Sequence, residues 1–277
     1  MNKQYNLSDY KLIVFDIDGT LVGSSHQLNT TTKEILLRLH QIGMPFTLAT
    51  GKILPATRDQ ADELQIKLPL ILSNGGVVQT RKGEILFHST LPLDITSKVI
   101  QICDEMDKDL VVYIDDRIYM KEMNDNISPV YSMVKSGLFE IDSWEKMDGL
   151  LAQINKCLIV DQNNPQNLKD LEEVFLNEFG DQADIVHTST KLVEVLPKGV
   201  TKATAVKRLA EDMGINMSEV MAFGDYDNDA PLLAEAGLGI CVENGSAVAK
   251  GAADLIIASC EENGPAKFLE KLMNAAE

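Results

Sequence analysis

The sequence alternates short, continuous apolar runs with segments whose apolar residues recur at helical spacing. The first run, residues 12–15 (LIVF), has no polar position, which is typical of a strand buried on both faces of a sheet. Residues 30–42 follow it with apolar side chains three or four positions apart, as in an amphipathic helix. Because parallel strands need crossover connections, this alternation predicts an α/β fold with a doubly wound, Rossmann-like parallel sheet and right-handed connections. Further strands are expected at residues 45–49, 68–72, 220–223, 237–241 and 255–257, and further helices at residues 53–64, 202–213 and 265–276.

The pattern changes in the middle of the chain. Short strands are expected there at residues 84–87, 110–114, 118–120, 156–160 and 183–186, helices at 95–106 and 166–179, and a hairpin turn at Asp115-Asp116-Arg117. No Pro/Gly/Ser-rich linker or repeat separates this region from its flanks. We therefore expect a core of residues 1–82 and 190–277, interrupted by an inserted α+β domain of residues 83–189.

Composition excludes several classes of function. The 25 basic and 42 acidic side chains give a net charge of −17, which argues against binding to nucleic acids or to anionic membranes. The four cysteines lie far apart without a CxxC pair, so neither a zinc site nor a disulfide framework is expected. No run approaches the roughly 18 apolar residues of a membrane span, and no signal-peptide pattern occurs. We expect a cytoplasmic protein, and no obligate protein partner is evident.

Polar groups follow the first two expected strands directly. Asp16 and Asp18 come after the first strand, and carboxyl ends of parallel strands are where ligands bind. Two carboxylates this close could serve as nucleophile and general acid/base if a cation reduces their repulsion, although a polar turn would give the same short pattern. Thr50-Gly51 follows the second strand, where a hydroxyl and an open backbone N–H could hold a phosphate oxygen or form an ordinary turn.

A lysine stands in the first turn of a later helix. Thr201 is a plausible N-cap, which places Lys202 where the helix dipole disfavours a cation. A use other than stability is therefore indicated, such as binding an anionic phosphate beside exposed N–H groups. The alternatives are a solvated surface lysine, or Lys198 in the same role.

The densest group of acidic residues is the stretch Gly224-Asp225-Tyr226-Asp227-Asn228-Asp229, after the expected strand at 220–223. Clustered carboxylates are costly without a cation, and oxygen ligands without His or Cys favour Mg²⁺. The EF-hand alternative is weak, because the loop lacks the glycine at position six and the glutamate at position twelve of that motif. Asp229, before Ala230-Pro231, is also expected to cap a helix, which needs no metal.

Together these motifs resemble the haloacid dehalogenase (HAD) superfamily, and more narrowly the Cof-type phosphatases with an α/β cap of type IIB. The similarity covers nearly the whole chain: DIDGT at Asp16, TG at Thr50, the lysine at Lys202 and GDYDND at Gly224. The long interval between Thr50 and Lys202 has room for the cap, as in the type II arrangement. The resemblance implies a HAD-like core fold.

It also implies the site residues. Asp16 would be the nucleophile that becomes an aspartyl-phosphate, and Asp18 the general acid/base. Asp16, the backbone carbonyl of Asp18, and Asp225 would bind Mg²⁺, with Asp229 in support. The phosphate would be held by the backbone N–H of Ile17 and by Thr50, Gly51, Lys202 and Asn228.

The sequence departs from the family pattern at Lys52, where arginine is common, and at Asn74-Gly75-Gly76, where NGA is usual. The resemblance implies a Mg²⁺-dependent phosphatase of small phosphorylated metabolites, such as sugar phosphates. A phosphomutase and a non-hydrolytic phosphate-binding or phosphoaspartate signalling module are the alternatives. The substrate is left open, and Tyr113, Asp115, Arg117 and Tyr119 are candidate contacts for it that a solvated hairpin would equally explain.

Overall fold

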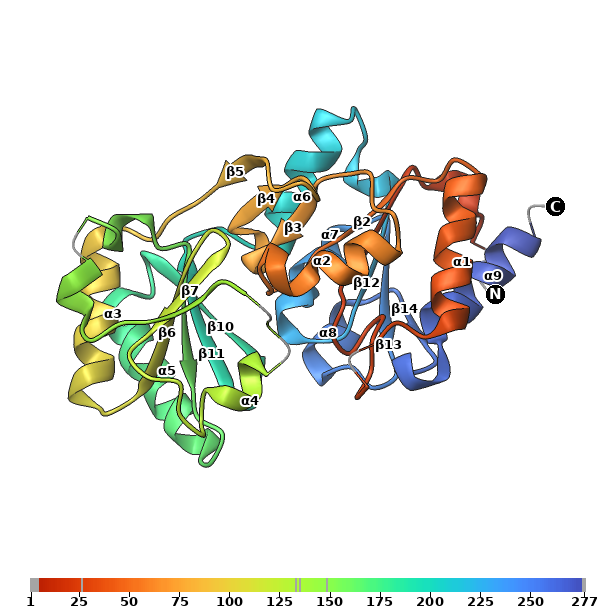
Figure 1. The fold of residues 1–277 in the computed structure, drawn as a ribbon. Coiled ribbons are helices and arrows are strands. Elements are labelled where there is room, and N and C mark those ends of the chain that lie inside the picture. The colour runs from red at the N-terminus through yellow and green to blue at the C-terminus, as the bar shows by residue number, and fades with distance from the viewer. Residues whose placement is uncertain (1–4, 26, 133, 135, 148, 276–277) are drawn as a thin grey trace.

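The chain folds around two main sheets in the computed structural model, which describes residues 5–25, 27–132, 134, 136–147 and 149–275 (Figure 1). The outermost residues of the expected core, 1–4 and 276–277, lie outside this description. The first sheet has the strand order β14-β13-β12-β1-β2, and every pairing in it is parallel. Its strands are β1 (Leu12–Phe15), β2 (Phe46–Leu48), β12 (Val220–Gly224), β13 (Leu238–Val242) and β14 (Leu255–Ile257).

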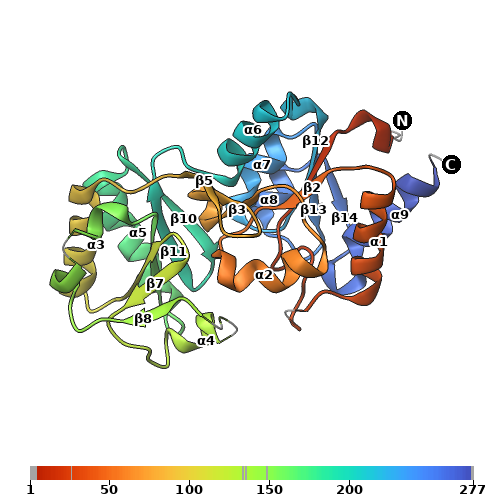
Figure 2. The same cartoon turned by 45° about the horizontal axis from the view of Figure 1, so that its top comes forward.

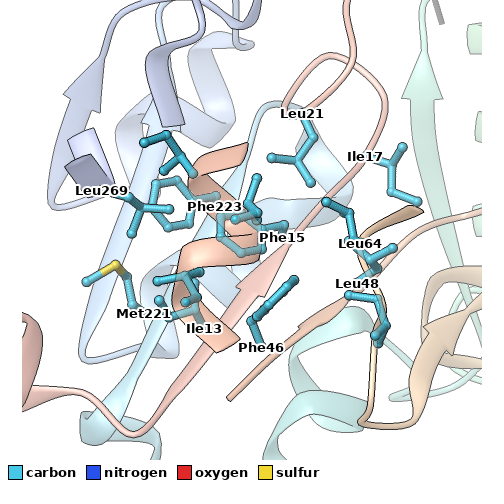
Figure 3. Close-up of a cluster of buried hydrophobic side chains, with 14 of the residues drawn as sticks. Ile13, Phe15, Ile17, Leu21, Phe46, Leu48, Leu64, Met221, Phe223 and Leu269 are labelled. Carbon is cyan, nitrogen blue, oxygen red and sulfur yellow. The ribbon is translucent and has the colours of Figure 1, made fainter. Parts of the chain in front are cut away.

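Helices cover both faces of this sheet, because the side chains of each strand alternate between two hydrophobic clusters. Phe15 and Phe223 lie against each other (Figure 3), with ring centroids 4.8 Å apart. They belong to the cluster covered by α1, α2 and α9. Val14 and Ala222 face the opposite cluster, under α6, α7 and α8. The sheet is therefore doubly wound, as the sequence predicts. The helices are α1 (Thr30–Gln41), α2 (Leu54–Glu63), α6 (Lys202–Asp212), α7 (Ala230–Glu235), α8 (Ala247–Ala252) and α9 (Gly264–Asn274).

The second sheet forms a separate lobe, on the left of Figures 1 and 2, with the strand order β10-β11-β9-β6-β7-β8. Its pairings are antiparallel except that between β7 and β8. The strands are β6 (Asp109–Ile114), β7 (Arg117–Met120), β8 (Leu138–Glu140), β9 (Lys156–Val160), β10 (Ala183–Ser189) and β11 (Leu192–Pro197). One face packs on α3 (Leu93–Glu105) and α5 (Pro165–Phe179). The other face packs on the short α4 (Ser128–Tyr131) and on Ile53 and Ala56 at the start of α2.

A small antiparallel sheet of β3 (Leu70–Leu72), β4 (Val77–Gln79) and β5 (Ile85–His88) lies between the two lobes. A parallel bridge between Ala49 and Ile71 joins it to the edge of the first sheet. The expected boundaries at 82/83 and 189/190 each divide a hairpin, since β4 pairs with β5 and β10 with β11. We therefore propose that the inserted domain runs from about residue 89 to Pro197.

Candidate active site

The polar residues that the sequence places after strands meet at the carboxyl edge of the first sheet. Asp16 follows β1, Thr50 follows β2 by two residues, and Asp225 follows β12. Since β12, β1 and β2 are neighbours in the sheet, their carboxyl ends lie side by side. Together with the second lobe they border a cleft of about 980 Å³, which Asp16, Asp18, Thr50, Gly51, Asp225 and Asn228 line.

Lys202 is the centre of a buried group of charges. Its side chain is 1% exposed, and its Nζ lies 2.5 Å from Asp16 Oδ1 and 2.6 Å from Asp229 Oδ1. Thr201 caps α6 through reciprocal hydrogen bonds with Thr204, which fixes where the first helical residue points. Burial by itself would lower the pKa of Lys202, but the adjacent carboxylates outweigh it and raise that pKa. Lys202 is therefore a buried, charged lysine and not a solvated surface lysine.

The alternative lysine does not reach the site. Lys198 is exposed, and its Nζ lies 3.0 Å from Asp184 and donates to the carbonyl oxygen of Gly180 at 2.9 Å. Both partners belong to the second lobe, at or next to its α5 and β10.

Asp229 occupies the N-cap position of α7, as expected, but its side chain makes no capping hydrogen bond to that helix. Its carboxylate instead accepts hydrogen bonds from the backbone N–H groups of Asp225 and Tyr226, at 2.9 and 3.2 Å, and from Lys202. Asp229 lies at the end of a single 3₁₀ turn, Asp227–Asp229, which folds its side chain back onto the start of the loop. The loop after β12 is thus fixed by the same carboxylate that holds Lys202.

Carboxylate oxygens of Asp16, Asp225 and Asp229 come within 4.8 Å of one another, close enough to hold one cation. Burial raises the pKa of Asp16 well above its ordinary value, as do Asp229 and Asp225, while Lys202 opposes the rise. Burial, and then repulsion from Asp229, raises the pKa of Asp225 to about 7. One lysine therefore does not balance three carboxylates. An oxygen-only donor set with excess negative charge fits a hard divalent cation, so these residues can hold a metal.

Gly19 makes room for this group. It has a φ of +82°, and a Cβ there would lie 2.2 Å from an oxygen of Asp225. The neighbouring Thr20 donates from Oγ1 to Asp225 Oδ1 at 3.0 Å. The glycine after the two aspartates is needed both for the turn and for the close approach of the loop after β12.

Asp18 lies at the mouth of the cleft and forms an ion pair with Lys52. The lysine Nζ is 2.7 Å from Oδ1 and 2.6 Å from Oδ2, and both side chains are about one-third exposed. The departure at Lys52 therefore places a cation directly on the second aspartate of the DIDGT motif.

The remaining predicted phosphate ligands surround the same edge. Thr50 is buried, and its Oγ1 accepts from the backbone N–H of Lys52 at 3.3 Å. Asn228 donates from Nδ2 to Asn74 Oδ1 at 2.9 Å. Ile17 buries its side chain in the core cluster, and a role for its N–H stays a prediction.

Of three further buried polar residues, Lys156 and Glu194 line the cleft and belong to no sequence motif, whereas Asn74 stands in the motif Asn74-Gly75-Gly76. Lys156 in β9 lies 2.9 Å from Glu194 in β11, and its Nζ also donates to the carbonyl oxygen of Gly51 at 2.8 Å. Asn74, in the turn after β3, donates to Glu194 at 2.6 Å. Of the candidate substrate contacts, Tyr113 lines the cleft, where its hydroxyl lies 2.7 Å from that of Tyr131.

The other candidate contacts have different partners. Asp115 lies 3.1 Å from His88 of β5, so this part of the hairpin contacts the small sheet. Tyr119 stacks on Phe139 with ring centroids 5.2 Å apart, and Arg117 is exposed. None of these three side chains is among those that line the described cleft.

A doubly wound core with an acidic, lysine-bearing edge facing an inserted α+β lobe defines a class of hydrolases. The chain belongs to the haloacid dehalogenase-like hydrolases, whose family pattern matches residues 13–269. It is 29% identical over 272 residues to the HMP-PP phosphatase of Cronobacter sakazakii (strain ATCC BAA-894), with 94% of each chain covered. It is 26% identical over 270 residues to the HMP-PP phosphatase of Yersinia pestis (strain Pestoides F), with 96% of each covered.

A solved structure supports the same relationship. A haloacid dehalogenase-like hydrolase from Bacteroides thetaiotaomicron superposes with a TM-score of 0.83 at 25% identity, over 95% of this chain and 99% of that one. The predicted family, the Rossmann-like fold with a cap, and an enzyme of the HAD type are confirmed. In the part of the chain that the structure describes, no helix has the length and apolar character needed to span a membrane.

Proposed function

We propose that the protein is a Mg²⁺-dependent phosphatase that hydrolyses small phosphomonoesters through an aspartyl-phosphate. The observation that supports this most is the buried carboxylate of Asp16, which lines the cleft and shares Lys202 with Asp229. A carboxylate can attack a phosphate ester only where positive charge offsets the repulsion between two anions. The relatives named HMP-PP phosphatase support the same reaction class.

The reaction that we propose has two displacements. An oxygen of Asp16 attacks the phosphorus atom, and the bond from phosphorus to the leaving oxygen breaks as Asp18 donates a proton to that oxygen. Asp18 then takes a proton from water, whose oxygen attacks the phosphorus of the aspartyl-phosphate. Phosphate leaves and the Asp16 carboxylate is restored. Asp18 at the cleft mouth has the access to solvent that this second step needs.

The surrounding groups would hold the transferring phosphoryl group. Lys202, Thr50, Asn228 and the backbone N–H groups of Ile17 and Gly51 would donate to its oxygens. Mg²⁺, when held by Asp16, Asp225 and the backbone carbonyl of Asp18 with Asp229 in support, would neutralise negative charge on phosphate and carboxylate oxygens.

The leaving group would occupy the part of the cleft under the second lobe. Apolar side chains of that lobe, Ile118, Leu158 and Leu192, line it beside Tyr113 and Tyr131. A cleft of about 980 Å³ has room for a small metabolite, and we propose this substrate class. The free cysteines of the chain agree with the cytoplasmic location that we propose.

The test is phosphate release from p-nitrophenyl phosphate and a phosphometabolite panel, with Mg²⁺ or EDTA. Wild type should release phosphate only with the metal, and Asp16→Asn should release none. Asp227→Asn is the matched control, because Asp227 belongs to the same acidic loop but accepts from Ser246 at 2.6 Å and does not join the three-carboxylate cluster. Wild type that releases no phosphate from any compound would reject the proposal, and transfer to a sugar phosphate would identify a mutase.

A further inference from the structure

A chain of hydrogen bonds crosses the cleft from the second lobe to the loop after β12. It begins at Glu194, 3% exposed, whose Oε1 accepts from Lys156 at 2.9 Å. Its Oε2 accepts from Asn74 Nδ2 at 2.6 Å, and Asn74 Oδ1 accepts from Asn228 Nδ2 at 2.9 Å. Four side chains from β9, β11, the turn after β3 and the loop after β12 are thereby connected in series.

The chemistry of Glu194 fixes the direction of this chain. A carboxylate paired with lysine has no hydrogen to donate, so Asn74 must present its NH₂ group to it. The oxygen of Asn74 then faces Asn228, which must present its own NH₂ group in turn. One hydrogen of that group binds Asn74, and the second is available to the cleft that Asn228 lines. Glu194, which can only accept, thus determines that the side-chain nitrogen of Asn228, and not its oxygen, faces Asn74.

The backbone is strained where it holds Asn74. Ser73 and Asn74 both have left-handed φ values, 48° and 56°, and such residues cost roughly 1–3 kcal/mol each. Asn74 is buried and lies against Gly51, where a Cβ would be 3.2 Å from Asn74 Nδ2. The Ser73 hydroxyl is buried and has no hydrogen-bond partner among the described residues. Strain of this kind persists where the surroundings require one geometry, here the placement of the Asn74 amide between Glu194 and Asn228.

Stability alone gives little reason for an ion pair at this place. A buried ion pair such as Lys156–Glu194 contributes little compared with well-packed apolar residues of the same size. The pair nevertheless stands on strands whose other residues are largely apolar, at the face that meets the core. Its contact with Asn74 leads on to Asn228, and its other contact is with the carbonyl oxygen of Gly51; Asn228 and Gly51 are both predicted phosphate-binding residues.

We propose that Glu194 is a positioning residue for phosphate binding, acting through Asn74 on the donor group of Asn228. The proposal rests on the proposed function, because that function makes Asn228 a phosphate ligand. Glu194 and Lys156 come from the second lobe, whereas Asn74, Gly51 and Asn228 come from the core. The phosphate site is therefore fully oriented only while the two lobes are in contact, and an open cleft binds phosphate more weakly.

Glu194→Gln tests the direction of the chain with almost no change in shape. The introduced amide keeps an oxygen for Lys156 and turns its NH₂ group to Asn74, so Asn74 must rotate and present nitrogen to Asn228. Asn228 then loses its partner or turns its oxygen toward the phosphate. Losing one hydrogen bond to a charged group should raise KM and the inhibition constant of inorganic phosphate about 10- to 100-fold. A smaller effect is expected on kcat.

The double variant Glu194→Gln/Asn74→Asp is the decisive comparison. The carboxylate now stands at position 74, where it accepts from both the introduced amide and Asn228, so the donor direction is restored with the same net charge. We expect KM and the phosphate inhibition constant to return to within about threefold of wild type. By the usual conversion, the remaining difference in binding free energy is then under about 1 kcal/mol. Glu172→Gln is the matched control, a glutamate of the same lobe that pairs with His187.

A purely structural role would give no rescue, because the double variant changes two buried positions. The proposal is overturned if Glu194→Gln, shown to be folded by circular dichroism, binds phosphate like wild type, or if the double variant binds no better than the single one. Binding of inorganic phosphate with Mg²⁺ by calorimetry gives the same comparison without turnover. Wild type that binds phosphate but hydrolyses nothing would reject the proposed function and leave this comparison intact.

Discussion

Replacing Asp225 with asparagine should make the metal-free protein more stable at pH 8. Asp225 shares a small, mostly buried volume with Asp16 and Asp229, and Lys202 forms ion pairs with those two carboxylates. Burial and the charge of Asp229 raise its pKa from the ordinary 3.8 to about 7. The ionised carboxylate is thus unfavourable in the folded chain, and the amide is a nearly isosteric neutral group that can still accept from Thr20.

The size of the effect follows from proton linkage. Below about pH 4 the carboxyl is protonated in both the folded and the unfolded chain, and its contribution to stability is fully present. Between about pH 4 and 7 the folded chain keeps a proton that the unfolded chain releases, so stability falls as pH rises through the pKa of about 7. About 1.4 kcal/mol for each tenfold change in proton affinity gives up to about 4 kcal/mol by pH 8. At roughly 2 °C per kcal/mol, Tm should rise by about 4–8 °C in Asp225→Asn.

The assay is thermal unfolding of both proteins in EDTA between pH 4.5 and 8. The difference in Tm should be small at pH 4.5 and should grow toward pH 8. Adding Mg²⁺ at pH 8 should reverse the order, because the metal stabilises wild type and the variant lacks one of its ligands. Equal Tm values in EDTA at pH 8, or a difference of the same size at pH 4.5, would refute the account of this carboxylate cluster.

Other substitutions separate the roles of the charged and apolar groups. Lys202→Met should abolish phosphate release and lower the free energy of unfolding by about 3–5 kcal/mol, measured by urea titration in EDTA, because it leaves buried carboxylates unpaired. Lys52→Met should change Tm little, since the ion pair of Lys52 with Asp18 is partly exposed, but it should lower kcat. Lys52→Arg keeps a cation beside Asp18 and should retain most of the wild-type kcat. Phe223→Ala should cost about 3–5 kcal/mol by the same titration, because the ring is fully buried against Phe15.

The predicted parts of the fold and site share one physical origin. A run such as LIVF at residues 12–15 is buried on both faces, and its next residue must lie at the carboxyl edge of a parallel sheet. Residues at such edges, Asp16 and Asp225 among them, are therefore placed by local sequence alone. Lys202 was also predictable, because a cation is unfavourable in the first turn of a helix unless something nearby compensates it. In the structure that compensation comes from Asp16 and Asp229.

The direction of the Asp229 side chain was not predictable from its neighbours. Its position before α7 suits a helix cap, but the carboxylate bonds instead to amides three and four residues earlier and to Lys202, 27 positions away in the chain. The first turn of α7 and the distant Lys202 compete for the Asp229 carboxylate, and the fold decides which of them it binds. A buried ammonium is the stronger partner for a carboxylate.

Glu194 and Lys156 lie beyond sequence reasoning for a different reason. Each is one charged position in a mostly apolar strand, a pattern that an exposed sheet face would also produce. Their pairing depends on the register of β9 with β11, in which Glu194 is opposite Leu158, two residues from Lys156. A shift of β11 by one residue along β9 would turn Glu194 away from Lys156, to the face that packs on α3 and α5. Register in the second lobe thus determines whether an acceptor-only group faces Asn74, and substitutions that disturb β9–β11 pairing should weaken phosphate binding without touching a core residue.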